Sequence, residues 1–208
     1  MIWQYSPYFI AFLACGCITL ILAVTGWRNR SSVCAKPFTL LMLAATLWSF
    51  GAALEVSSAD LTTQMFAVML QYPGIVTVPV GWLLFAFEYS GREHWITKKN
   101  LLLLSLVPAI SFLMVATNSA HHLFYTSVTE QAFGALMYAD ISFGPFFWFN
   151  IIYSYLIIYI AIMFILQRFV FTSGLYRGQM VAILIAILTP FFVNLAYAVR
   201  QINFIVID

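Results

Sequence analysis

Polar side chains lie within or directly beside the apolar stretches of this 208-residue sequence, and five of them are candidates to bind a ligand. They are Glu55, Tyr72, Asn150, Tyr153 and Asn194. A polar group in a membrane costs free energy unless a partner satisfies it, so such groups mark either ligand sites or contacts between helices. For each residue alone, a helix–helix contact is the simpler interpretation. For the five residues together, a shared ligand pocket is as good an interpretation as separate helix–helix contacts.

A second polar group follows the fourth apolar stretch and consists of Asn118, His121 and His122. Adjacent imidazole rings rarely reach the same metal ion, so we predict no metal site here. The simpler interpretation is that these side chains form hydrogen bonds to the loop backbone. A ligand-contacting or pH-sensing role is the alternative, because imidazole titrates near neutral pH.

Catalytic chemistry is not predicted. The sequence contains no Gly-x-Ser-x-Gly elbow, P-loop, His-Glu-x-x-His or Cys-x-x-Cys motif, and no nucleophile–base pair is visible. The three lysines, Lys36, Lys98 and Lys99, lie outside the apolar stretches, so none can carry a retinal Schiff base within them. We therefore predict no catalytic residue, no cofactor and no enzyme activity within this chain.

The composition predicts an integral membrane protein. Hydrophobic residues make up 63% and charged residues 8%, whereas soluble domains are about half apolar and a quarter charged. The lipid bilayer is thus the first predicted partner. The net charge of +2 is small and scattered, which argues against nucleic-acid binding.

Six apolar runs are long enough to cross a membrane, which takes roughly 20 residues. The predicted spans are residues 8–27, 37–54, 65–89, 101–116, 145–166 and 179–199. Membrane spans of this length are helical, because a helix satisfies its own backbone groups in lipid. The predicted fold is one all-α domain over residues 1–208, a bundle of six transmembrane helices. An apolar tail follows, so the chain is either a complete six-span protein or a seven-helix bundle truncated before its last helix.

The basic residues predict the orientation of the bundle. Eight of the nine arginines and lysines fall in the first, third and fifth connections, and the second and fourth connections contain none. Since basic loops stay in the cytoplasm, the N-terminus is predicted to lie outside the cell membrane.

The fourth connection, residues 117–144, is too long for a turn and too apolar for a flexible linker. Residues 124–129 and 135–141 are rich in β-forming types, and Gly134 lies near a plausible turn between them. We predict a short β-hairpin-like lid over the extracellular mouth of the bundle.

The third span contains helix-weakening residues at unusual density. Pro73, Pro79 and Gly81 fall within it, together with Trp82. Neighbouring helices can satisfy the carbonyl groups that proline frees in a membrane. A kinked helix of this kind is typical of a cavity wall, so we expect Trp82 to be a ligand contact and the other three to form a hinge.

With these motifs in order, the chain resembles the N-terminal seven-transmembrane sensor region of membrane histidine kinases. The resemblance rests on Trp48, Glu55, Tyr72, Pro73, Gly74, Pro79, the run from Trp82 to Gly91, Trp95, Pro108, Thr117, Asn118, His121, His122, Gly144, Pro145, Phe147, Trp148, Pro190, Asn194 and Tyr197. It implies an outside N-terminus, a seventh helix, and cytoplasmic signalling domains. This sequence departs from the family there, because it ends before such a helix and has no phosphoacceptor box or ATP-binding domain.

The predicted function is therefore the sensory input domain of a two-component histidine kinase. It would bind a small molecule from the outer side and signal by helix rearrangement to a cytoplasmic kinase module, in cis or in trans. A second copy of the chain is a further candidate partner. The alternatives are a small transporter or channel, and a structural subunit of a membrane complex.

Overall fold

The structure is a computed structural model that describes residues 2–133, 136–170, 178, 181–193 and 195. Its elements are α1 (Tyr8–Arg28), α2 (Ala35–Ser57), α3 (Leu61–Tyr89), the short 3₁₀ helix η1 (Glu93–Trp95), α4 (Lys98–Ala116), α5 (Asn118–His121), β1 (Tyr125–Phe133), β2 (Leu136–Phe143) and α6 (Pro145–Val170). Among the described residues, five helices are long and apolar enough to cross a membrane, and Val181–Val193 forms a shorter apolar helix. Part of the sixth predicted span lies outside the described residues.

Helices α3 and α4 begin earlier than hydropathy alone predicts. Helix α3 starts four residues before the predicted span, because the Asp60 carboxylate accepts a hydrogen bond from the Thr63 N–H group. Helix α4 starts three residues early for the same reason, with the Thr97 hydroxyl accepting from Asn100 N–H. These side chains satisfy the free N–H groups of a first turn, so the helix extends beyond its apolar part.

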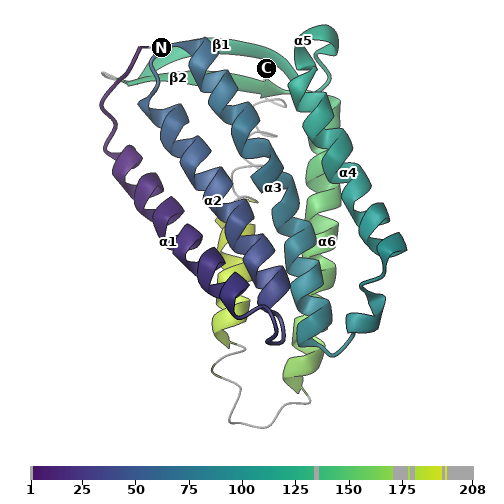
Figure 1. The fold of residues 1–208 in the computed structure, drawn as a ribbon. Helices are drawn as coiled ribbons and strands as arrows, with labels where there is room; N and C mark the ends of the chain where they lie inside the picture. The colour runs from purple at the N-terminus through teal and green to yellow at the C-terminus, as the bar shows by residue number, and fades with distance from the viewer. Residues whose placement is uncertain (1, 134–135, 171–177, 179–180, 194, 196–208) are drawn as a thin grey trace.

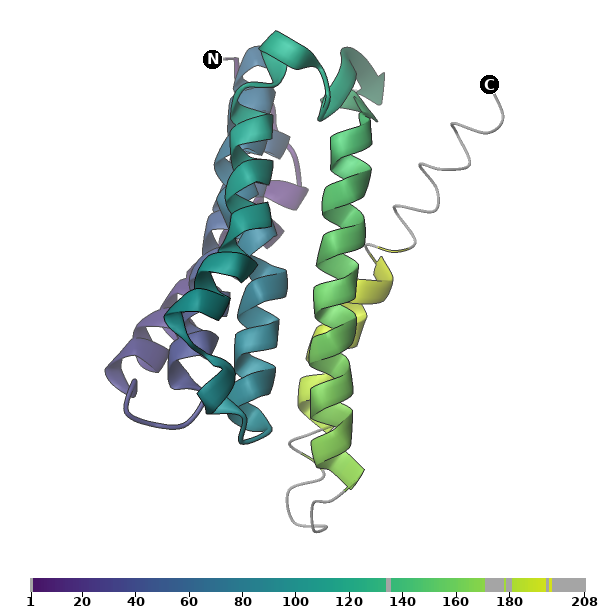
Figure 2. The same cartoon turned by 90° about the vertical axis from the view of Figure 1, so that its right-hand side faces the viewer.

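Helices α1, α2 and α3 lie side by side in sequence order, and α6 stands against α3 (Figures 1 and 2). The contact between α2 and α3 is close. A Cβ atom added at Gly74 would lie 2.5 Å from the Ala44 carbonyl oxygen, and one at Gly81 would lie 2.9 Å from the Leu41 side chain. Small residues allow membrane helices to approach in this way.

The two strands form an antiparallel hairpin that crosses one end of the bundle, called here the hairpin end (Figure 1). The register pairs Val128 with Ile141 and Thr129 with Asp140, and it shifts between Tyr125 and Ser127. This two-stranded sheet confirms that the fourth connection contains β-structure. Both strands are longer than predicted.

The N-terminal segment joins the hairpin to the turn between α2 and α3. The Gln4 side chain donates to the Met137 carbonyl and accepts from the Met137 N–H group, both at 2.8 Å. Gln64 of α3 donates to the same carbonyl at 2.9 Å, and Ile2 N–H donates to Asp60 at 2.7 Å. These bonds attach the hairpin to two separate parts of the chain.

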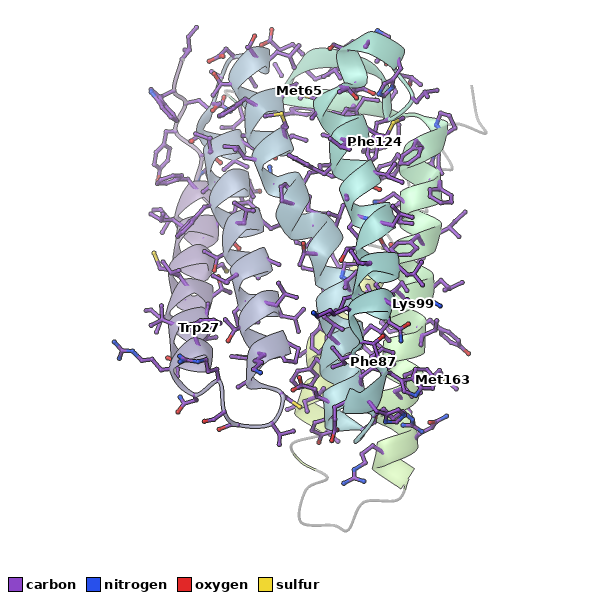
Figure 3. All side chains as sticks on the ribbon, turned by 45° about the vertical axis from the view of Figure 1, so that its right-hand side comes forward. Trp27, Met65, Phe87, Lys99, Phe124 and Met163 are labelled. Carbon is purple, nitrogen blue, oxygen red and sulfur yellow. The ribbon has the colours of Figure 1, made fainter. Side chains whose placement is uncertain are left out.

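Buried side chains form two clusters along the bundle. One lies towards the hairpin end and is centred on Tyr72, Phe124 and Phe147. The other lies towards the opposite end, where Phe87 of α3 packs with Ile165 of α6. Figure 3 shows this separation, with Phe124 near the hairpin and Phe87 in the other half of the bundle.

The opposite end carries the described basic side chains, at the ends of α1 and α6, the start of α2 and the connection between α3 and α4. There the Glu88 carboxylate accepts from the Cys34 N–H group at 2.8 Å, which joins α3 to the start of α2. Burial, and then the charge of Glu88, raise the pKa of the Cys34 thiol to about 12. The thiol is therefore protonated at neutral pH and is a poor nucleophile.

Candidate functional site: a cavity beneath the hairpin

A cavity of about 270 Å³ lies beneath the hairpin, between α2, α3, α6 and the helix Val181–Val193. Its roof comes from the hairpin residues Tyr125, Ile141 and Phe143. This volume lies just below the roughly 300–1,000 Å³ that ligand pockets commonly span, so the cavity has room only for a small molecule.

Helix α3 forms one wall of the cavity along a single stripe. Val68, Tyr72, Ile75, Pro79 and Trp82 recur at spacings of three and four residues and all line the space. At 1.5 Å per residue this wall is roughly 20 Å long. The site is therefore an elongated slot that runs from the hairpin towards the middle of the bundle.

Few polar groups face this slot. The Glu55 carboxylate of α2 accepts a hydrogen bond of 2.5 Å from the side-chain amide of Gln71 in α3. Asn150 of α6 is 4% exposed and accepts from the Ser111 hydroxyl of α4 at 2.9 Å. The buried Tyr155 hydroxyl also belongs to the lining, and it has no hydrogen-bond partner among the described residues. An apolar slot with a few fixed polar groups is typical of a ligand site.

Four of the predicted ligand contacts line the cavity, namely Glu55, Tyr72, Trp82 and Asn150. The predicted hinge residue Pro79 lines it as well. Tyr153 does not, because its hydroxyl donates to the Leu104 carbonyl of α4 at 2.7 Å. Asn194 lies outside the described residues.

Asn118 organises the hairpin instead of lining the cavity. Its side-chain oxygen accepts from the N–H groups of Phe124 and Tyr125, at 2.9 and 3.0 Å, and its amide donates to the Tyr125 carbonyl at 2.9 Å. These bonds fix the start of β1, and Tyr125 in turn contributes to the roof. Asn118 is thus a positioning residue for the site.

The two histidines lie just before the hairpin and outside the cavity lining. The His121 ring accepts from Leu123 N–H at 3.0 Å and lies 3.2 Å from the Thr117 hydroxyl. His122 adopts a left-handed backbone conformation, with φ of 53°, which turns the chain into the hairpin. Within the described part of the chain, no group of three or more His, Cys, Asp or Glu side chains could hold a metal ion.

Many lining residues were not among the predicted contacts, and Trp48, Gln71 and Tyr155 are three with polar or aromatic side chains. Trp48 lies two helical turns before Glu55, and this spacing places both on one face of α2. Gln71 precedes Tyr72 and is an amide within an apolar span. The helical spacing from Glu55 would have identified Trp48, and the polarity of its side chain would have identified Gln71. Tyr155 gives no such signal, because α6 carries several tyrosines.

Comparison with known proteins agrees with the architecture. The model of the family described as the N-terminal 7TM region of histidine kinase matches residues 11–208. No curated protein and no solved structure matches the chain. The match covers nearly all of the helices and the whole cavity lining. The chain therefore belongs to the N-terminal seven-transmembrane region family of histidine kinases, the membrane sensor part of these signalling proteins and not their catalytic part.

Proposed function

We propose that this chain is a ligand-binding input domain that responds to a small, partly apolar molecule held beneath the hairpin. The observation that carries this proposal is the slot itself, with Glu55 and Asn150 on apolar walls. A bundle that served only as an anchor would gain stability by filling such a space, because empty volume costs packing energy. The proposed output is a rearrangement of helices passed to a cytoplasmic kinase module, in cis or in trans.

The charge distribution supports an orientation with the hairpin and the N-terminus outside the cell membrane. The described basic residues gather at the opposite end, and Lys99 is one of them (Figure 3). Basic segments remain on the cytoplasmic side. The ligand then enters from the outer side, and the hairpin acts as a lid over the slot.

The rearrangement has a defined starting point in α3. One stripe of this helix lines the cavity, and the helix continues to Tyr89 and η1 at the opposite end. A ligand changes such an equilibrium only through different affinities for two states, and about 1–3 kcal/mol of coupling is typical. The proposed hinge at Pro73, Pro79 and Gly81 would let the outer half of α3 move relative to the inner half. The homodimer remains a prediction.

Two neighbouring residues of α6 give a matched test. Ile151 lines the cavity, whereas Ile152 is 66% exposed on the outer surface of the bundle. Ile151→Trp should fill the slot and abolish the response of the attached kinase to its stimulus, measured as autophosphorylation in membranes. Ile152→Trp should leave the response intact.

Equal responses of the two variants would exclude the slot as the sensory site. Solute flux in proteoliposomes, abolished by Ile151→Trp but not by Ile152→Trp, would instead indicate a transporter or channel. Expression and unfolding of both variants should be measured first, so that a response lost through misfolding is not mistaken for a response lost through a filled slot.

A further inference from the structure

We propose that the slot binds a small organic cation, an ammonium group on an apolar body, with Glu55 as its counter-ion and Trp48 as its aromatic contact. This inference rests on the proposed function, because it names the class of ligand for the same cavity. It follows from the charge, the aromatic walls and the shape of the slot.

The first observation concerns charge. Glu55 is the single ionisable acid or base among the described residues that line the cavity, apart from tyrosines. One of its oxygens, Oε2, accepts from Gln71, and Oε1 accepts from no described residue. A partly buried carboxylate favours a positive partner, since attraction between opposite charges is strong where water is scarce. No described arginine, lysine or histidine lines the slot to supply one.

The end of the helix that carries Glu55 has the same polarity. Glu55 lies in the last turn of α2, which ends at Ser57. The C-terminal end of a helix carries partial negative charge from its unpaired carbonyl groups. An anionic ligand would therefore meet both the carboxylate and the negative end of the helix, and a cation would be favoured by both.

The second observation concerns the walls. Trp48 lies seven residues before Glu55 on the same face of α2, or about 10 Å along the helix axis. Tyr72 and Phe147 line the slot from the facing helices. Aromatic faces attract ammonium groups, tryptophan most strongly, and a cage of aromatic rings is a typical site for a quaternary ammonium ligand.

The third observation concerns shape. Beyond Trp48 the lining is mostly apolar, with Trp82 of α3 and Ile158 of α6. The hydroxyl groups of Ser154 and Tyr155 are uncharged and are the polar groups of this deeper part. The slot thus offers a carboxylate with aromatic rings near the hairpin and an apolar end deeper in the bundle. An alkylammonium ion has this distribution of charge and apolar surface.

A series of three probes with the same hexyl chain tests the inference: hexyltrimethylammonium, hexanol and hexyl sulfate. Each would be titrated at pH 7.5 into the protein in zwitterionic lipid nanodiscs, with tryptophan fluorescence and calorimetry as readouts and empty nanodiscs as the control for lipid partitioning. We expect the cation to bind at least about tenfold more tightly than the alcohol, and the sulfate to bind most weakly.

Variants test whether the Glu55 carboxylate is responsible for the preference for the cation. Glu55→Gln keeps the size of the side chain and should weaken hexyltrimethylammonium at least about tenfold while changing hexanol binding less than twofold. Asp140→Asn removes an exposed carboxylate of the hairpin and should change neither. If Glu55→Gln does not fold, two other results test the inference: the order of affinities of the three probes for the unaltered protein, and the loss of cation binding in Trp48→Leu.

The outcomes separate the two proposals. Hexanol binding in the slot as tightly as the cation, or unchanged cation binding in Glu55→Gln, would overturn the ligand class and leave the sensory cavity standing. Failure of all three probes to bind, combined with an unchanged kinase response in Ile151→Trp, would overturn the proposed function itself.

Discussion

Helix α3 presents two neighbouring stripes that differ in residue size and in what they contact. Ala67, Gly74 and Gly81 recur every seven residues and face α2, where a Cβ atom at Gly74 would lie 3.0 Å from the Trp48 backbone nitrogen. The other stripe, from Val68 to Trp82, carries larger side chains and borders the cavity. The same helix is thus closely packed on one side and borders empty volume on the other.

This difference indicates where the bundle can rearrange. Backbone contacts between α2 and α3 leave no room for sliding, so α2 should follow α3 in any rearrangement, including a bend at the proposed hinge. The side facing α6 can gain or lose contacts by filling the cavity, without breaking backbone packing. A ligand that occupies the slot would therefore act on the position of α6 relative to α3. The following predictions test that contrast.

The largest expected effect is that of Gly74→Ala. The added methyl group meets the backbone of Ala44 and Trp48, so the two helices must separate. We expect a loss of about 2 kcal/mol in the free energy of unfolding, in spite of the better helix propensity of alanine. The measurement is unfolding by sodium dodecyl sulfate in mixed micelles, followed by tryptophan fluorescence.

Ser154→Thr is the matched control, since it also adds one methyl group but places it on the cavity wall. We expect it to change the free energy of unfolding by less than about 0.5 kcal/mol. Similar losses in the two variants would contradict the contrast between the close α2–α3 contact and the cavity wall.

Asn118→Ala should have the next largest effect, on the roof of the cavity. It removes three hydrogen bonds to the start of β1, so we expect a loss of about 2 kcal/mol or less. Amide hydrogen exchange at Tyr125 should become faster. Asn118→Asp keeps the acceptor for two of the bonds and should lie between the alanine variant and the unaltered protein; unchanged exchange in both variants would show that the side chain does not hold the hairpin.

Gln4→Ala tests the attachment of the hairpin to the N-terminal segment. Both of its bonds to Met137 would be lost, while Gln64 keeps its own. We expect a local effect of about 1 kcal/mol, seen as faster exchange of the Met137 amide and not as global unfolding. Tyr5→Ala, at a side chain that is 81% exposed, should leave that exchange rate unchanged.

The smallest effect is a pH dependence from Asp60 at the hairpin end. Hydrogen bonds from the Thr63 hydroxyl and then from Ile2 N–H lower the pKa of Asp60 from 3.8 to about 2. A lowered pKa contributes stability that is complete above pH 3.8 and is lost as the pH falls towards 2. The difference in stability between the unaltered protein and Asp60→Asn should therefore shrink over that interval. A constant difference would show that Asp60 is not stabilised in its charged form.

The sequence predicted the helical elements well because membrane spans depend on length and apolarity, both of which can be read locally. The third span illustrates the limit: its end at Tyr89 agrees with the structure, but its start depends on the Asp60 cap. The hairpin was predicted from β-forming residues around Gly134. Its attachment through Gln4 was not, because that contact joins residues far apart in the chain.

The site was less predictable, because it depends on how each helix is rotated about its axis. Tyr153 and Tyr155 are two residues apart in α6, yet the first bonds to α4 and the second lines the cavity. Hydropathy does not distinguish them. Asn118 was chosen for its polarity, but local turn geometry determines what its side chain does.

The roof described above also has a consequence for rates. Tyr125, Ile141 and Phe143 all belong to the hairpin. With the hairpin as the proposed lid, a molecule entering from that end would have to wait for the hairpin to move. Loop and lid motions take microseconds to milliseconds. Association from that end should therefore be slower than diffusion allows and should stop accelerating at high ligand concentration. Such a sensor would average over brief fluctuations of its stimulus and respond to a sustained presence.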